Sequence, residues 1–174
     1  MIDEAHARDI EFHAWMNPYR ISTRVAGGSF AALPSSIDPT WVVDFPTIRI
    51  YNPALPEVRQ RLVDIVKDMI TKYDVDGIHF DDYFYPEGVT FSDQGDFTRY
   101  GAGISSIQNF RRDNVDKAIK GVYDAIVATK PSVVFSVSPA PEINKNFNTL
   151  YADVVKWNRE GWVDVVIPQL YQEI

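Results

Sequence analysis

The 174-residue chain contains no cysteine, and this absence excludes disulfide bridges and thiolate metal sites. The sequence also lacks any uninterrupted apolar run near the roughly 18 residues that a membrane helix needs. Its first residues, MIDEAHARDIEF, lack the basic-then-apolar layout of a secretory signal. We therefore expect no membrane-spanning segment, while the cellular compartment stays open because a chain without cysteine suits oxidising and reducing surroundings alike.

Basic clusters are also scarce, because Arg111 and Arg112 are the one adjacent pair. Acidic side chains number 24 against 17 basic ones, which gives a formal net charge of -7. This balance argues against nucleic acid or an anionic membrane surface as the partner. The apolar content of 45% is enough for one sizeable core, so we expect residues 1–174 to form a single domain.

What the sequence does contain is an alternation of strand-like and helix-like segments. Runs rich in β-branched or aromatic residues occupy 10–15, 77–80, 133–138 and 163–171, and each leads into a polar, proline-containing stretch. Apolar residues at helical spacing occupy 56–73, 105–131 and 149–161, and residues 1–9 resemble the end of another helix. This order predicts βα units and therefore a parallel sheet.

The longest predicted loops, 17–50 and 83–103, both follow the carboxyl end of a strand. In βα folds the carboxyl ends of the strands form the edge where ligands bind. We therefore expect function to reside on that edge.

Within DGIHFDDYFYP, residues 76–86, strand alternation divides the side chains between two faces. Ile78 and Phe80 are predicted to pack under the helices, and Asp82 falls on their side. His79 and Asp81 are predicted to face the barrel or cleft, together with Tyr83. Two adjacent carboxylates repel one another, so the pKa of one rises unless a cation or hydrogen-bond donors hold both ionised. Adjacent aspartates are also common as solvated turn residues, and the motif alone leaves both interpretations open.

Further polar and aromatic residues gather at the ends of the four predicted strands. They are His13, Trp15, Asn17, Tyr19 and Arg20 at the first strand, His79, Asp81, Asp82, Tyr83 and Tyr85 at the second, Ser138 and Glu142 at the third, and Gln169, Tyr171 and Glu173 at the fourth. Carboxylates and amides bind hydroxyl groups, and aromatic rings stack on pyranose faces. The constellation predicts a carbohydrate substrate and calls for no cofactor.

Six segments, EFHAWMNPYR, NPALPEVRQRLVDIV, YDVDGIHFDDYFYP, FRRDNV, SVSP and GWVDVVIPQLYQEI, resemble in this order the bacterial glycosyl-hydrolase-like family ten. The resemblance implies a TIM barrel related to glycoside hydrolases. A looser similarity to the alpha-amylase superfamily, where a D-G-x-x-x-D strand ends in the catalytic nucleophile, points to Asp81. Asn17 would match that superfamily's active-site asparagine. The superfamily's general acid would fall at Ser138, where this chain has no carboxylate, and Glu142 is the nearest one.

In that register the chain supplies strands three to six of eight. A complete (β/α)8 barrel usually takes about 250 residues, so we expect an α/β fold that is a partial barrel and a fragment of a longer protein. Its sheet would have two exposed edges, which self-association could mask.

The resemblance implies a glycoside hydrolase that acts on a complex or cell-wall polysaccharide, in a bacterial cell-envelope or secreted setting. We expect Asp81 to act as nucleophile or base. For the acid we favour Glu173 over Glu142, because alternation places Glu173 with Gln169 and Tyr171. His79 is expected to donate to Asp81 or to substrate, or else to be a satisfied interior histidine.

Two alternatives remain open from the sequence. HFDDY superficially resembles the FDD strand of metal-dependent polysaccharide deacetylases, but that chemistry needs a histidine pair at helical spacing. His6, His13 and His79 are the only histidines and form no such pair, so no metal site is predicted. The other alternative is a non-catalytic carbohydrate-binding module, because fold does not fix function.

Overall fold

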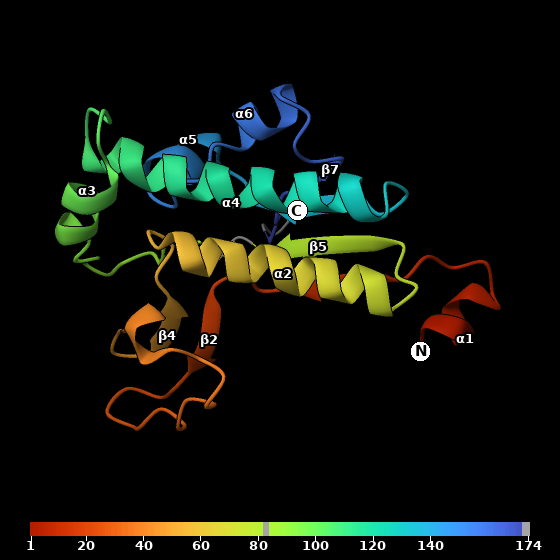
Figure 1. Ribbon diagram of the computed structural model, residues 1–174, viewed down its shortest axis with the longest axis horizontal. Coiled ribbons are helices and arrows are strands. Elements are labelled where there is room, and N and C mark those ends of the chain that lie inside the picture. The colour runs from red at the N-terminus through yellow and green to blue at the C-terminus, as the bar shows by residue number, and fades with distance from the viewer. Residues whose placement is uncertain (82–83, 172–174) are drawn as a thin grey trace.

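The computed structural model describes residues 1–81 and 84–171, and its framework is a four-stranded parallel sheet (Figure 1). The strands are β1 (His13–Met16), β5 (Gly77–Asp81), β6 (Val134–Ser138) and β7 (Val165–Val166). They lie side by side in their order along the chain. Parallel strands in chain order make the singly wound arrangement of a (β/α)8 barrel, whereas a doubly wound sheet reverses its order. The four predicted strands and the partial-barrel fold class are confirmed.

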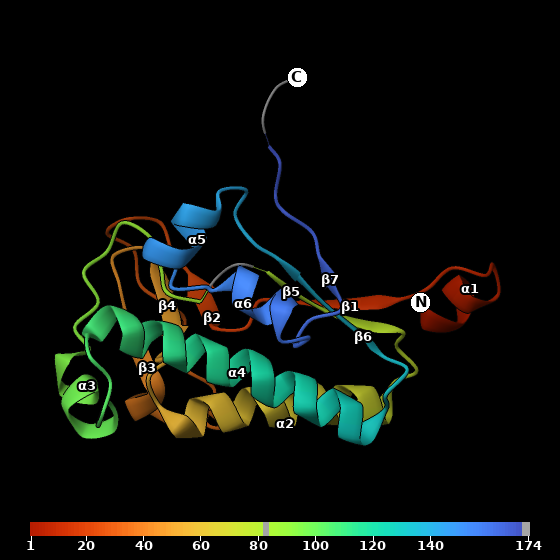
Figure 2. The ribbon, with the colours of Figure 1, turned by 90° about the horizontal axis from the view of Figure 1, so that it is seen from above.

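Two long helices, α2 (Pro56–Lys72) and α4 (Ile107–Thr129), cover one face of this sheet (Figure 2). Helix α2 buries the residues at steps of four along one side, namely Val58, Leu62, Val66 and Ile70. Ser106 caps the start of helix α4, and its hydroxyl accepts a hydrogen bond from the backbone N–H of Asn109 in the first turn. Beneath the helices, Phe80 and Phe135 pack edge to face with ring centroids 5.1 Å apart. The helices predicted at 56–73 and 105–131 are therefore confirmed as α2 and α4, whose apolar sides pack into the core.

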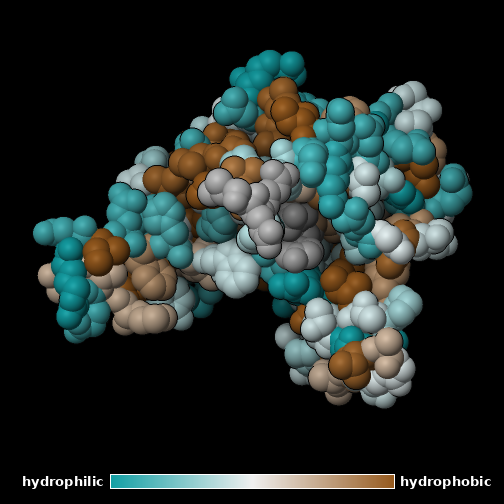
Figure 3. Space-filling view, turned by 180° about the vertical axis from the view of Figure 1, so that it is seen from behind, coloured by the Kyte–Doolittle hydropathy of each residue, from teal (hydrophilic) through white to brown (hydrophobic). Residues whose placement is uncertain are grey.

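The opposite face of the sheet is not covered by α2 or α4, which both lie on its other side (Figure 2). In the view from behind, apolar side chains gather above the middle of the molecule (Figure 3). Several large apolar side chains are exposed on β1, on β7 and on the segment after β7. They are Trp15 at 64%, Val165 at 42%, Ile167 at 50%, Leu170 at 70% and Tyr171 at 86%. In a closed barrel this face of the sheet would line the interior. We call it the open face, because α2 and α4 leave it uncovered.

The predicted loop at 17–50 instead contains a second, antiparallel sheet in the order β2–β4–β3. Its strands are β2 (Arg20–Thr23), β3 (Val42–Asp44) and β4 (Ile48–Tyr51), and the 3-10 helix η1 (Pro39–Trp41) precedes β3. Strands of three or four residues carry too little alternation to stand out from a loop. We call this antiparallel sheet and its connections, residues 20–51, the second lobe. The second lobe follows β1 and lies beside the amino-terminal end of α2 (Figures 1 and 2).

The remaining helices are short. They are α1 (Ile2–His6), α3 (Gln94–Tyr100), α5 (Ile143–Asn148) and α6 (Val154–Arg159). Helices α3 and α5 were not predicted, since one or two turns give no clear period. Helix α6 begins later than expected because Asp153 caps it, accepting from the N–H of Lys156 at 3.1 Å. Among the described residues no helix is long and apolar enough to cross a membrane.

Candidate active site

The candidate site is centred on β5, which lies between β1 and β6. Ile78 and Phe80 are fully buried on the helix-covered side of this strand. His79 and Asp81 project from the other side, towards the open face. The alternation predicted from the sequence is therefore confirmed for these four residues.

Asp81 lies at the carboxyl end of β5 and is 8% exposed. Its Oδ1 accepts a hydrogen bond from Nε2 of Gln169 at 2.9 Å. The same Nε2 donates to the carbonyl oxygen of Ser138 at 2.9 Å, and the backbone N–H of Gln169 donates to the carbonyl of Pro139 at 2.9 Å. A nitrogen between two acceptors fixes which way the amide points. Gln169 therefore holds the Asp81 carboxylate against the end of β6, and the fold brings together two predicted site residues.

His79 lies one inward-facing position before Asp81. Its Nδ1 is 2.7 Å from the hydroxyl oxygen of Ser136, the residue opposite it on β6. Burial lowers the pKa of His79 below its ordinary value, with a smaller contribution from His13, while the negative charge of Asp81 opposes the shift. The imidazole is therefore neutral at neutral pH.

Gly77 begins β5 and faces His13 across the β1–β5 pair. A Cβ atom at residue 77 would overlap the imidazole ring of His13, so the ring occupies the space that glycine leaves. His13 Nε2 also lies 3.1 Å from a carboxylate oxygen of Glu11. His13 therefore packs in the layer below His79, further from the carboxyl edge than Asp81.

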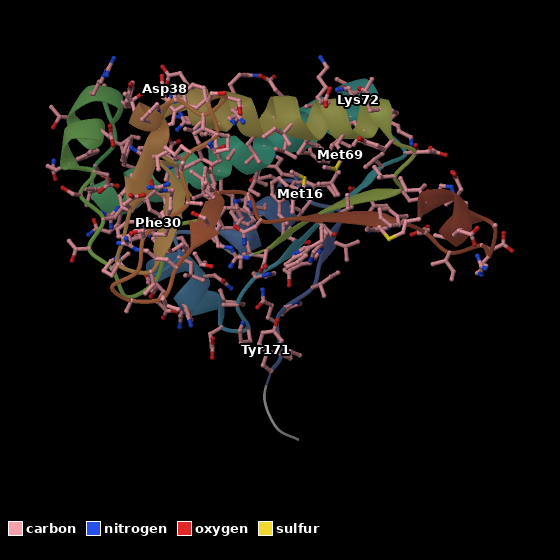
Figure 4. All side chains as sticks on the ribbon, turned by 90° about the horizontal axis from the view of Figure 1, so that it is seen from below. Met16, Phe30, Asp38, Met69, Lys72 and Tyr171 are labelled. Carbon is pink, nitrogen blue, oxygen red and sulfur yellow. The ribbon has the colours of Figure 1, made fainter. Side chains whose placement is uncertain are left out.

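Two predicted aromatic residues are well exposed on or beside the open face. Trp15 lies opposite His79 in the β1–β5 register. Tyr171 lies on the segment that leaves the sheet after β7 (Figure 4). Exposed aromatic rings offer flat apolar faces on which sugar rings can stack.

Asn17 and Arg20 follow β1 and are both half-buried. The side-chain oxygen of Asn17 accepts from the N–H of Arg20 at 3.0 Å, and this turn leads the chain into β2. The Nδ2 of Asn17 is buried and has no hydrogen-bond partner within the described part of the chain. Arg20 lines a cavity of about 400 Å³ between β2, β4 and residues 31–37 of the second lobe.

Two predicted substrate-binding residues lie in the core. Tyr19 is completely buried, and its ring meets Phe84 at 6.3 Å between centroids. Tyr85 is 2% exposed and packs against the rings of Phe91 and Tyr151. Burial raises the pKa of both tyrosine hydroxyls. The structure corrects the expectation for these two rings, which support the loops from beneath because strand alternation does not extend into the connections.

Of the two candidate acids, Glu142 lies within the described residues and Glu173 does not. Glu142 is exposed at the start of α5, on the connection that follows β6, and its side chain makes no capping hydrogen bond. The predicted residues Asp82, Tyr83 and Glu173 lie outside the described residues. Within the described ranges, no group of three or more His, Asp or Glu side chains is arranged to hold a metal ion.

Two features of the site region were missed by the sequence reasoning. Ser136 is 2% exposed and contacts His79. Its signal is the alternation of Ser136 and Ser138 with Phe135 and Val137, which puts both serines on the open side of β6.

The second missed feature is a clamp around Arg111 of α4. Its guanidinium donates to both carboxylate oxygens of Asp93 at 2.9 and 2.6 Å, to the carbonyl of Phe91 at 3.0 Å and to the hydroxyl of Tyr151 at 2.9 Å. Asp93 is 1% exposed, and its hydrogen bonds to Arg111 raise the pKa of the arginine. The clamp joins the connection after β5 to the connection after β6.

One solved structure and two curated proteins are similar to this chain over most or all of its length. A solved structure, the alpha-galactosidase from Lactobacillus brevis, aligns with a TM-score of 0.44 and 18% identity over 79% of this chain and 18% of that one. "Glycosyl hydrolase YngK" of Bacillus subtilis (strain 168) is 36% identical over 195 residues, which cover all of this chain and 38% of the relative. "Glycosyl hydrolase DigH" of Escherichia coli (strain K12) is 33% identical over 197 residues, which cover 98% of this chain and 45% of the relative.

The chain thus spans less than half the length of these curated relatives. The profile of one protein family, described as "Glycosyl hydrolase-like 10", matches residues 1–174, the whole chain. Together with the identity to the two relatives, this match shows that the chain belongs to the glycosyl hydrolase-like 10 family.

Proposed function

We propose that this chain forms part of the active site of a glycoside hydrolase that acts on a complex or cell-wall polysaccharide. The observation that carries the proposal is Asp81, a carboxylate at the carboxyl end of the central strand that Gln169 holds on the open face of the sheet. Membership of a glycosyl hydrolase-like family supports the same class of chemistry.

Glycoside hydrolysis needs two carboxyl groups. One protonates the leaving oxygen as the glycosidic C–O bond breaks. The other attacks the anomeric carbon or takes a proton from the attacking water. The two groups lie about 5 Å apart in retaining enzymes and about 6.5–9.5 Å apart in inverting ones.

In this proposal Asp81 is the nucleophile or base, and Glu173 is the acid, with Glu142 as the second candidate. Trp15 and Tyr171 offer exposed rings for stacking on the sugar. Asn17, Arg20, His13, His79, Asp82, Tyr83 and Gln169 are the proposed polar and aromatic surroundings of the substrate.

The test is a glycan hydrolysis screen with the full-length protein predicted to carry this segment. We expect Asp81→Asn to lower kcat by about 10³-fold, because the amide can neither attack nor accept a proton. Glu173→Gln and Glu142→Gln should identify the acid, since only one of them should cause a comparable loss. Asp64→Asn, the same change on the outer side of α2, is the matched control and should leave turnover unchanged. Full turnover by Asp81→Asn would refute the assignment.

One observation favours a second candidate function, a carbohydrate-binding module without catalysis. Trp15 and Tyr171 are exposed whether or not chemistry takes place beside them. This alternative predicts that the wild type binds glycans without turnover and that Asp81→Asn binds them equally well. The family resemblance also supports a cell-envelope or secreted setting, which fractionation of cells that express the full-length protein would test.

A further inference from the structure

The contact between His79 and Ser136 determines which nitrogen of the imidazole ring carries its proton. Ser136 is 2% exposed and lies directly opposite His79 in the β5–β6 register. Its Oγ is 2.7 Å from Nδ1 of His79 and 3.4 Å from the carbonyl oxygen of Ile78. The hydroxyl therefore has two neighbours, but it has only one proton to donate.

Proton counting separates the two possible arrangements. If Ser136 donates to Nδ1, the contact with the Ile78 carbonyl carries no hydrogen bond. If Nδ1–H of His79 donates to Oγ, the hydroxyl proton remains available to the Ile78 carbonyl, and both contacts become hydrogen bonds. The second arrangement satisfies more polar groups in a buried place, where an unmade hydrogen bond is costly.

The other ring nitrogen, Nε2, has no hydrogen-bond partner among the residues that the structure describes. The ring is half-buried on the open face, one inward-facing position before Asp81. With the proton on Nδ1, the neutral ring presents an unshared electron pair at Nε2. This nitrogen can accept a hydrogen bond but cannot donate one.

We infer that Ser136 is a positioning residue that fixes His79 as the Nδ1-protonated tautomer, so that Nε2 accepts a hydrogen bond from a substrate hydroxyl beside Asp81. The substrate part of this inference rests on the proposed function. Two neighbouring acceptors, Nε2 and the Asp81 carboxylate, suit the hydroxyl groups of a neutral sugar. They would repel the carboxylate, sulfate or phosphate of an anionic one.

Nitrogen NMR of the ¹⁵N-labelled 174-residue chain tests the tautomer directly, because protonated and unprotonated ring nitrogens resonate far apart. The chain has only three histidines, and His79→Gln assigns the signal by removing it. At about pH 7.5, where the low pKa of His79 leaves it neutral, we expect the protonated shift at Nδ1 and the unprotonated shift at Nε2. The opposite pattern in the wild type would overturn the inference without any variant.

Ser136→Ala should move the two nitrogen shifts towards the Nε2-protonated pattern, and Ser136→Thr, which keeps the hydroxyl, should retain the wild-type pattern. Ser138→Ala is the matched control, since Ser138 is on the same side of β6 but lies opposite Asp81, whereas Ser136 lies opposite His79 and bonds its ring. It should also retain the wild-type pattern. An unchanged pattern in Ser136→Ala would contradict a role for Ser136 in fixing the tautomer.

In the full-length protein, Ser136→Ala should lower kcat/KM about tenfold, the equivalent of one hydrogen bond. The loss should appear mainly in KM, because the bond is made in the ground state as well as in the transition state. Ser132→Ala, at an exposed position just before β6, is the control and should leave kcat/KM unchanged. A changed tautomer with an unchanged KM would overturn the acceptor role of Nε2. If the wild type hydrolyses no glycan, the proposed function fails, and with it the substrate role, while the NMR result still decides the tautomer.

Discussion

Gly77 allows the imidazole ring of His13 to lie close against β5, because a Cβ atom at this position would overlap the ring. Asp76, just before it, accepts from the backbone N–H of Phe12 at 2.7 Å. These contacts fix β1 beside β5, and so they set the position of Trp15 opposite His79. The glycine of the D-G-x-x-x-D spacing thus has a packing role in this chain.

Gly77→Ala should lower the free energy of unfolding by about 2 kcal/mol, because the new methyl group would overlap the His13 ring in a strand held on both sides. Urea denaturation measures the change. The double variant Gly77→Ala with His13→Ala should recover most of the loss, since the overlapping ring is then absent. Equal losses in the single and double variants would show that the ring is not the cause.

At this scale the sequence predicted the faces of β5 because alternation is reliable inside a strand. It could not predict that Tyr19 and Tyr85 are buried, since both lie in connections where no period applies. The hydrogen bond from Gln169 to Asp81 joins residues 88 positions apart, and only the position of β7 beside β6 brings them together. The partner acid stays a prediction.

Among the elements, α6 is joined to α4 by one buried carboxylate. Asp116 of α4 accepts from Nε1 of Trp157 at 2.6 Å and from Nζ of Lys156 at 2.6 Å. Trp157 is completely buried and Asp116 is 6% exposed. Burial raises the pKa of Asp116, and the two hydrogen bonds oppose the shift.

Asp116→Ala should cost about 3 kcal/mol of the free energy of unfolding, because it leaves the indole N–H and the lysine without their acceptor. Asp124→Ala is the matched control on the same helix. Its exposed pair with Lys120, four residues away, should contribute less than about 0.5 kcal/mol. Urea denaturation of both variants checks the difference, and similar losses would contradict a special role for the buried carboxylate.

Helix α1 is attached to the start of β5 through His6, whose Nε2 lies 2.8 Å from Oδ2 of Asp76. The hydrogen bond to Asp76 raises the pKa of His6 above its ordinary value of 6.5, and the charges of Asp76, Asp74 and Asp3 add to the shift. Lys130 also faces this group through its ion pair with Asp74 at 2.7 Å. The pKa of Asp76 is lowered, first by the N–H of Phe12, so Asp76 stays ionised at neutral pH.

Because the pKa of His6 is higher in the folded state, its contribution to stability is complete below pH 6.5 and is lost as the pH rises through the folded-state pKa. The unfolding free energy of the wild type should therefore exceed that of His6→Gln by more at about pH 6 than at about pH 9. Denaturation at the two pH values measures this difference. A gap of the same size at both values would show that the charge on His6 contributes nothing.

The elements that the sequence predicted well are the long ones. Helices α2 and α4 carry several turns of apolar period, and the strands that precede the polar stretches are rich in Val, Ile and Phe. Elements of three to seven residues, such as β2–β4, α3 and α5, are fixed by their tertiary contacts, which no local pattern contains. The second lobe was therefore predicted as a loop.

For the whole molecule, the parallel sheet has two edges within the described residues, because β1 pairs only with β5 and β7 only with β6. Unpaired N–H and C=O groups on such edges favour pairing with another chain. The exposed apolar side chains on the open face add a hydrophobic contribution. The net charge of -7 opposes association, and salt screens this repulsion.

We expect the 174-residue chain to self-associate in a concentration-dependent way that strengthens with salt, as measured by sedimentation velocity. Val165→Lys places a charge on the edge strand β7 and should shift the equilibrium towards monomer. Val25→Lys, at an exposed position of the second lobe, is the control and should not. A stable monomer at every concentration and salt level would refute the expectation.

The pairing of β1 with β5 also has a consequence for synthesis on the ribosome. Phe12 and Asp76, which meet at the start of this pair, are 64 residues apart in the sequence. His79 and its partner Ser136 on β6 are 57 residues apart. At a translation rate of about 5–20 residues per second, each strand emerges several seconds before its next neighbour. During that interval the nascent sheet has an open edge, and chaperones that bind extended apolar segments would have time to act before β6 completes the surroundings of Asp81.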